Sequence, residues 1–203
     1  MSANIIDITI MEAVMADEEK TGLNHRGEVT NELRKARHED TACMYDDTSG
    51  LVSYYLFEDR LQTAINYESH KDVRVKRDKI VVLGINVENL NLFENPNDII
   101  REVAVRMKIY LPSNYTLARG IRYTFWLMMP RLNTNEEINL ELARVRTIFR
   151  TPLKNNERLV TSMGASIYDG EDIRAKGLVE KAIIALQRAQ SQGENNLMFY
   201  SGN

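Results

Sequence analysis

The stretch that decides the fold is Ala118-Arg119-Gly120-Ile121-Arg122-Tyr123-Thr124-Phe125-Trp126-Leu127-Met128-Met129-Pro130. It predicts a β-hairpin, in which one strand leads into a tight turn and a second strand follows. Large apolar side chains in a central strand are usually buried. We therefore expect Phe125, Trp126, Met128 and Met129 to pack in the core and not to form a cofactor surface.

The spacing of apolar residues predicts helices and strands on both sides of this hairpin. Lys79 to Val87 is a near-continuous apolar run, as expected for a strand covered on both faces. Thr134 opens a capping box with Glu137, which marks a helix start. Helices are expected at 51–67, 96–110, 134–149 and 172–191, and further strands at 159–167 and 197–200. This order indicates an α/β fold, an α+β sandwich with one sheet.

Composition and charge exclude several classes of function. The chain has 203 residues, of which 43% are hydrophobic and 27% charged, with a formal net charge of -3. A slightly negative charge argues against a nucleic-acid partner. No apolar segment is long enough to span a membrane and no signal peptide is evident, so we expect a cytoplasmic protein. A single cysteine, Cys43, excludes an internal disulfide, and Cys/His ligands are too few for a metal site of that type.

Residues 1–45 differ from the rest and are predicted to form an N-terminal extension. An apolar patch at 5–15 precedes an acidic run, and 28–38 is a charged, helix-favouring stretch with few apolar residues. A helix that polar is not stable alone and must dock against something. We expect this extension to dock on a partner or to support dimerisation, and residues 46–203 to form the main domain.

The hairpin resembles the signature hairpin of GGDEF domains, the bacterial diguanylate cyclases that make cyclic di-GMP. The family pattern there is roughly A-R-Y-G-G-D-E-F-A-V-L-L-P, and Ala118, Arg119, Phe125 and Pro130 match it. Four further segments are similar to family motifs in the same order, at 46–61, 86–95, 159–166 and 182–195. The resemblance implies a nucleotide-cyclase-like domain with a central, mostly antiparallel five-stranded sheet flanked by helices.

The resemblance also identifies positions where the family's metal ligands are replaced. The five signature positions are Ile121, Arg122, Tyr123, Thr124 and Phe125 in this chain. The two metal positions fall on Asn86 and Tyr123, and the fourth signature position, acidic in the family, falls on Thr124. Joining two GTP molecules requires a divalent metal with hard anionic oxygen ligands. A neutral amide and a phenol are poor ligands for Mg²⁺, so no metal or other cofactor is expected.

The positions that the family uses for phosphate and guanine differ as well. A lysine and an arginine of the family match Gln190 and Glu194, and the second replacement reverses the charge. The guanine-reading asparagine falls on Glu94. The two turn glycines, which allow the backbone to approach phosphate closely, are Ile121 and Arg122 here. The resemblance therefore implies that the cyclase reaction has been lost.

The inhibitory product site of the family is also changed. Its R-x-x-D motif corresponds to Leu111-Pro112-Ser113-Asn114, so both the guanidinium and its acidic partner are missing. Arg144 is the nearest match to an arginine that the family places on the helix after the hairpin. We expect Arg144 to lie on a solvated helix face, and a ligand-binding role is the alternative interpretation.

Two functions follow from the resemblance. The favoured one is an inactive GGDEF-like domain that acts as a scaffold for a bacterial signalling or polarity protein, with a homodimer as one candidate assembly. The alternative is a receptor for cyclic di-GMP or another nucleotide, which would use Arg119, Arg122 or Arg144 in a rearranged site. Ligand binding at micromolar concentration separates the two.

Overall fold

The computed structural model describes residues 44–72, 74–171 and 174–201. The predicted extension at 1–45 lies outside these ranges, apart from its last two residues. The elements in chain order are β1 (Val52–Ser53), α3 (Tyr54–Ser69), β2 (Lys79–Val87), η1 (Leu90–Leu92), α4 (Pro96–Tyr110), β3 (Thr116–Arg119), β4 (Thr124–Leu132), α5 (Asn135–Arg150), β5 (Thr161–Tyr168), α6 (Ala175–Ser191) and β6 (Leu197–Phe199).

One mixed sheet runs through the described part of the chain, in the order β1-β3-β4-β2-β5-β6. The central strand β2 is antiparallel to both β4 and β5, whereas the short edge strands β1 and β6 are parallel to β3 and β5. The sheet is mostly antiparallel, as the resemblance implies, but it has six strands and not five. The additional strand is β1, whose residues 52 and 53 were expected to belong to the first helix.

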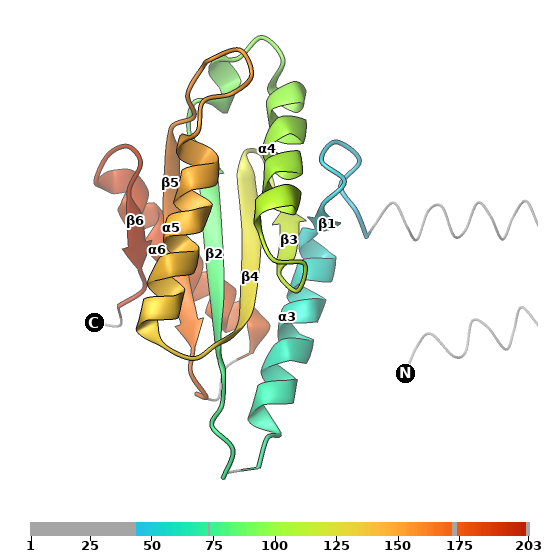
Figure 1. Cartoon of the computed structure of the whole chain (residues 1–203), viewed down its shortest axis with the longest axis vertical. Coiled ribbons are helices and arrows are strands. Elements are labelled where there is room, and N and C mark those ends of the chain that lie inside the picture. The colour runs from blue at the N-terminus through green and yellow to red at the C-terminus, as the bar shows by residue number, and fades with distance from the viewer. Residues whose placement is uncertain (1–43, 73, 172–173, 202–203) are drawn as a thin grey trace, which may run out of the picture. The chain divides into compact units, whose positions relative to one another are not determined.

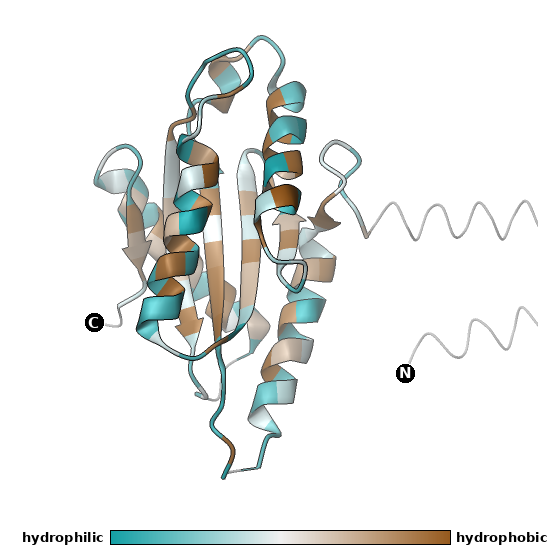
Figure 2. Cartoon of the chain, viewed as in Figure 1, coloured by the Kyte–Doolittle hydropathy of each residue, from teal (hydrophilic) through white to brown (hydrophobic). Residues whose placement is uncertain are grey.

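Helices cover both faces of the sheet. Helices α4 and α5 lie side by side on the face toward the viewer in Figure 1, and α3 and α6 lie behind it. Each face has its own core, because side chains alternate along a strand. On β2, Leu83 and Ile85 pack with α4 and α5, whereas Ile80 and Val82 pack with α3 and α6. Apolar residues follow the strands, whereas α4 and α5 carry both polar and apolar residues on the faces turned to the viewer (Figure 2).

The second strand of the hairpin is buried, as expected. Phe125 and Met129 are fully buried, and Trp126 and Met128 are nearly so. Trp126 packs against Tyr54 and Phe57 of α3, and Phe125 meets Phe149 of α5 edge to face. These side chains therefore hold the helices on the sheet, and the prediction of core packing is confirmed.

Helix α6 lies very close to the sheet at Gly164 of β5. A Cβ atom at this position would lie 2.0 Å from the backbone nitrogen of Leu186 and 2.5 Å from the carbonyl oxygen of Ala182. Only glycine leaves room for this approach.

Among the described residues, no helix has the length and apolar character needed to cross a bilayer.

Candidate functional site

The turn of the signature hairpin is closed by backbone hydrogen bonds. Gly120 donates its N–H to the carbonyl of Thr124 at 2.8 Å, and Thr124 donates to Ile121 at 3.2 Å. Arg122 has a φ of 53°, in the left-handed region that favours glycine. Ile121 is 83% exposed at the tip. The turn thus presents a branched side chain and a long cation where the family presents bare backbone.

Gly120 is required by packing inside the hairpin. A Cβ atom on this residue would lie 2.7 Å from the indole nitrogen of Trp126. Trp126 is nearly buried on the α3 and α6 face, so it cannot move aside freely. This contact could not be predicted from residue types, because it depends on how the Trp126 ring lies across the turn.

The predicted metal positions hold neutral side chains. Asn86 lies opposite Thr124 in the β2–β4 register, and the Thr124 hydroxyl donates to Asn86 Oδ1 at 3.4 Å. On the other side of Asn86, the register places the buried Ser162 of β5. The ring of Tyr123 packs against the core under α4 and α5. Across the described residues, no group of three or more His, Cys, Asp or Glu side chains could hold a metal ion.

Arg119 is buried and bonded inside the hairpin. It is 8% exposed, and its guanidinium donates to the carbonyl of Thr124 at 2.6 Å. The same guanidinium lies over the ring of Phe125, 5.0 Å from its centre. Burial lowers the pKa of Arg119, and the charge of Asp46 partly opposes that shift. These contacts make Arg119 a brace for the turn more than a free ligand-binding group.

The predicted phosphate positions lie at the end of α6. Gln190 donates its amide N–H to the Glu88 carboxylate at 2.9 Å, which links α6 to the residue after β2. Glu194 and Glu94 are both exposed. Beside Glu194, Asn195 accepts the backbone N–H of Thr161 at the start of β5, at 3.2 Å. The side chains at this end therefore contribute negative charge where bound phosphates would need positive charge.

The predicted inhibitory segment begins in the core and ends at the surface. Leu111 is 6% exposed and caps α4 by donating its N–H to the carbonyl of Met107 at 3.0 Å, whereas Asn114 is exposed. Tyr115 follows and hydrogen-bonds to Glu141 of α5; burial, together with the Glu141 charge, raises the pKa of Tyr115. Arg144 pairs with the same carboxylate at 3.1 Å. Arg144 thus belongs to a cluster with Tyr115 and Glu141, whereas Arg119 and Arg122 belong to the turn.

A groove of about 850 Å³ lies between α4 and α5. Arg144 lines it, together with two other kinds of residue: exposed apolar side chains of α4 and polar or charged side chains from both helices. The lining residues are Asp98, Arg101, Glu102, Val105, Arg106, Ile109, Tyr110, Arg144, Thr147, Ile148, Thr151 and Lys154. This groove was not predicted. The available signal was the position of Val105 and Ile109, two apolar residues that lie off the buried stripe of α4.

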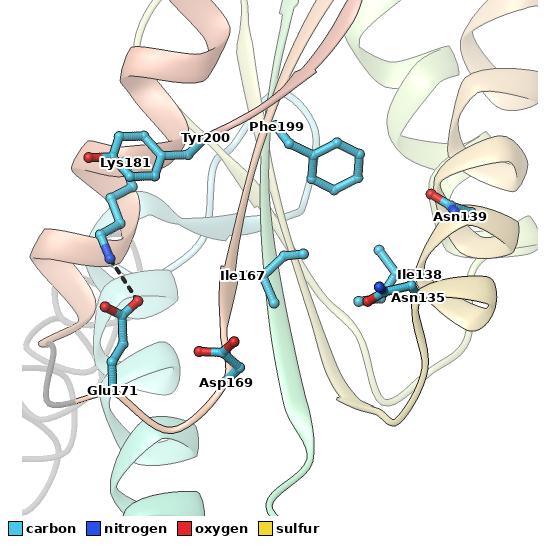
Figure 3. Close-up of a pocket in the computed structure, with 9 residues that line it drawn as sticks. All are labelled: Asn135, Ile138, Asn139, Ile167, Asp169, Glu171, Lys181, Phe199 and Tyr200. Carbon is cyan, nitrogen blue, oxygen red and sulfur yellow. Dashed lines mark hydrogen bonds and ion pairs between the residues drawn. The ribbon is translucent and has the colours of Figure 1, made fainter. Parts of the chain in front are cut away.

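A second pocket, of about 520 Å³, lies near the C-terminal ends of β5 and β6. Phe199 and Tyr200 point to opposite sides of the chain there, and Lys181 pairs with Glu171 at 2.7 Å (Figure 3). Ile167 in this pocket pairs with Val81, five residues along β2 from Asn86. Five strand residues span about 17 Å. This pocket is therefore distinct from the signature turn.

Comparison with known proteins was made at the level of families and of solved structures. Residues 43–196 match the family model described as "Diguanylate cyclase, GGDEF domain". The coiled coil and GGDEF domain of DgcB from Caulobacter crescentus, in complex with c-di-GMP, has a TM-score of 0.69 at 17% identity, covering 93% of this chain and 98% of that one.

Two more solved structures are similar. The isolated GGDEF domain of DgcB, also in complex with c-di-GMP, has a TM-score of 0.67 at 16% identity, covering 78% of this chain and 94% of that one. Diguanylate cyclase SiaD from Pseudomonas aeruginosa, in complex with its activator SiaC, has a TM-score of 0.66 at 16% identity. The match covers 97% of this chain and 78% of that one. No curated protein sequence matches. At these identities the structural likeness establishes the fold alone.

Proposed function

This chain belongs to the GGDEF domain family, and from that premise we propose that it is a member without cyclase activity that serves as a protein-interaction module in bacterial signalling. The observation that carries the proposal is the neutral pair formed by Asn86 and Thr124 at 3.4 Å. In an active member this end of the sheet has to gather carboxylates around a divalent metal.

The electrostatics around this pair support the same conclusion. Glu88 is engaged by Gln190, and Glu194 and Glu94 are exposed, so these positions add no positive charge for a triphosphate. Arg119 is bonded to the carbonyl of Thr124, which leaves Arg122 as the exposed cation of the turn. Catalysis of phosphoryl transfer depends mainly on positioning and on stabilisation of negative charge. Around Asn86 and Thr124, the described residues provide neither the metal ligands that would position the phosphates nor the cations that would stabilise their negative charge.

A turnover assay tests the loss of activity. The full chain is incubated with GTP and Mg²⁺, and in parallel with Mn²⁺, and the nucleotides are separated by liquid chromatography. We expect no cyclic di-GMP above the protein-free control. An active GGDEF domain in the same buffer shows that the assay works. Product that increases in proportion to the amount of this protein would overturn the proposal.

A receptor for cyclic di-GMP is the second candidate function. It is favoured by one observation: Arg144 is exposed beside Tyr115, in the segment between α4 and β3 where the family places its inhibitory motif. Solved DgcB structures contain c-di-GMP. At the two positions of the lost motif, Leu111 is buried and Asn114 is exposed but uncharged, so Arg144 is the cation that would contact such a ligand there.

Calorimetry separates the two functions. Cyclic di-GMP is titrated into the full chain, into Arg144→Ala, and into Arg74→Ala, an exposed arginine of the segment between α3 and β2. The absence of binding heat in all three titrations would support the interaction module. Saturable heat at micromolar ligand that is lost only in Arg144→Ala would establish the receptor instead.

A further inference from the structure

Helix α4 presents apolar side chains to solvent along the groove between α4 and α5. Val105 is 54% exposed, Ile109 68% and Tyr110 63%. Val105 and Ile109, four residues apart, lie on one face of the helix, and Tyr110 at its end lines the same groove. Their neighbours Val103, Ala104 and Met107 are buried against the sheet, so α4 has a second apolar side that the described part of this chain does not cover. Exposed apolar side chains gathered along one groove are typical of an interaction site.

The wall of this groove is rigidly held by Arg106. Its guanidinium donates to the carbonyls of Ile148, Thr151 and Pro152 and pairs with Glu102 at 2.6 Å. One partly buried cation thus ties α4 to the end of α5. A groove fixed in this way exists before a partner arrives, which reduces the entropy lost on binding.

The groove is basic on a chain that is acidic as a whole. Its lining includes four Arg or Lys residues and two carboxylates, a net charge of +2 against -3 for the whole chain. Both carboxylates of the lining are already paired, Asp98 with Arg101 and Glu102 with Arg106, each at 2.6 Å. Lys154 has no carboxylate within ion-pair distance among the described residues. The charge that remains is therefore positive.

We propose that this groove is the docking site of the interaction module, and that its occupant is an amphipathic helix of a partner protein whose apolar stripe is flanked by Asp and Glu. The proposal rests on the function proposed above. From Asp98 to Tyr110 the groove is about 18 Å long, which fits roughly three turns of helix. The floor is made of helices, whose backbone groups are bonded internally, so side chains must provide recognition. A concave surface also fits a helix better than a flat membrane.

Peptide selection tests the site and the chemistry together. A displayed library of peptides about 16 residues long, with an apolar helical stripe fixed and all other positions random, is panned on the full chain. The same library is panned on Ile109→Glu, on Tyr110→Glu and on the matched control Tyr55→Glu, which lies on α3 at 78% exposure. We expect peptides rich in Asp and Glu beside the stripe. Their affinity should fall at least about tenfold in the two α4 variants and stay unchanged in the control.

Five results would overturn the proposal. Three concern the selection: no enrichment over the Ile109→Glu panning, enrichment of peptides with Lys and Arg flanks, and equal binding to all variants. The fourth is binding of the full chain to anionic lipid vesicles that Ile109→Glu abolishes. The fifth is a dimer of the full chain that Ile109→Glu dissociates, which would assign the groove to a second copy. GTP turnover is measured on the same preparation. Formation of cyclic di-GMP would refute the proposed loss of cyclase activity. If no product forms and no peptide is selected, the proposed role of the groove as a docking site is refuted, but the loss of activity is not.

Discussion

Arg119 illustrates how a residue that matches a family motif can act on structure alone. Its guanidinium bonds the carbonyl of Thr124 and stacks on Phe125. Removing a buried charged donor costs about 1–3 kcal/mol. Arg119→Met should therefore lower the free energy of unfolding by about that amount in urea denaturation followed by circular dichroism. Arg122→Met, on the exposed turn, should stay within about 0.5 kcal/mol of the unmodified chain. Equal losses in the two variants would show that Arg119 does not brace the turn.

Gly164 and Gly84 lie opposite each other in the β5–β2 register, but their surroundings differ. A Cβ atom on Gly164 would meet the backbone of α6 at 2.0 Å, whereas one on Gly84 would meet the end of the Trp126 ring at 3.0 Å. Backbone cannot move aside as a side chain can. We expect Gly164→Ala to lose about 3 kcal/mol or more and Gly84→Ala about 1 kcal/mol in thermal unfolding. A Gly164→Ala protein as stable as Gly84→Ala would mean that α6 does not rest on Gly164.

At the scale of elements, helix α5 depends on its N-terminal capping box. Glu137 donates its N–H to the Thr134 hydroxyl at 3.2 Å, and the Glu137 carboxylate accepts from Thr134 at 3.3 Å. Thr134→Ala should destabilise the fold by about 1 kcal/mol, as measured by chemical denaturation. Thr151→Ala at the other end of the helix is the matched control, because its exposed hydroxyl only donates to Thr147 at 2.8 Å. A Thr151→Ala loss as large as that of Thr134→Ala would contradict the capping argument.

Tyr115 couples the segment before β3 to helix α5 and makes that junction sensitive to alkaline pH. Burial and Glu141 raise its pKa above the ordinary value of 10.0. The unfolded chain therefore loses this proton first as the pH rises. Stability should be unaffected by this group below about pH 10 and should decrease above it.

The variant Tyr115→Phe has no such proton, so its stability should decrease less between pH 10 and 11 than that of the unmodified chain. Denaturant midpoints recorded across this range measure the difference. Tyr55→Phe on the exposed side of α3 should follow the unmodified curve. Parallel curves for Tyr115→Phe and the unmodified chain would show that burial and Glu141 do not raise the pKa of Tyr115 in the folded chain.

The elements themselves were largely predictable from the sequence. The apolar run at 79–87 is β2, the predicted helix from residue 96 is α4, and the capping box at Thr134 begins α5. Strand β1 was missed because two residues carry no periodic pattern, and they are a strand only through pairing with Ala118 and Arg119. The start of α6 at Ala175 also differs from the predicted 172, since Arg174 precedes it without a side-chain cap.

At the scale of the molecule, the replaced motif residues of the candidate site could be predicted from the sequence, but the groove could not. The replaced residues at Asn86 and Tyr123 can be identified in the sequence, because they interrupt a known motif at fixed positions. The groove between α4 and α5 cannot, since Val105 and Lys154 come together only when the two helices lie against each other on the sheet. Pairing of the Arg119 guanidinium with the Thr124 carbonyl likewise depends on the turn geometry and not on residue type.

The thermal stability of the whole chain should not change when GTP, the cyclase substrate, is added. A ligand present at 100 times its Kd stabilises the folded state by about 2.7 kcal/mol, which corresponds to roughly 5–10 °C in Tm for a domain of this size. Because Asn86 and Thr124 provide no anionic metal ligand, we expect GTP with Mg²⁺ to shift the Tm by less than about 1 °C in differential scanning fluorimetry. An active GGDEF domain gives the reference shift in the same experiment. A Tm that rises steadily with GTP concentration would show that this end of the sheet still binds the nucleotide and would restore the cyclase site to consideration.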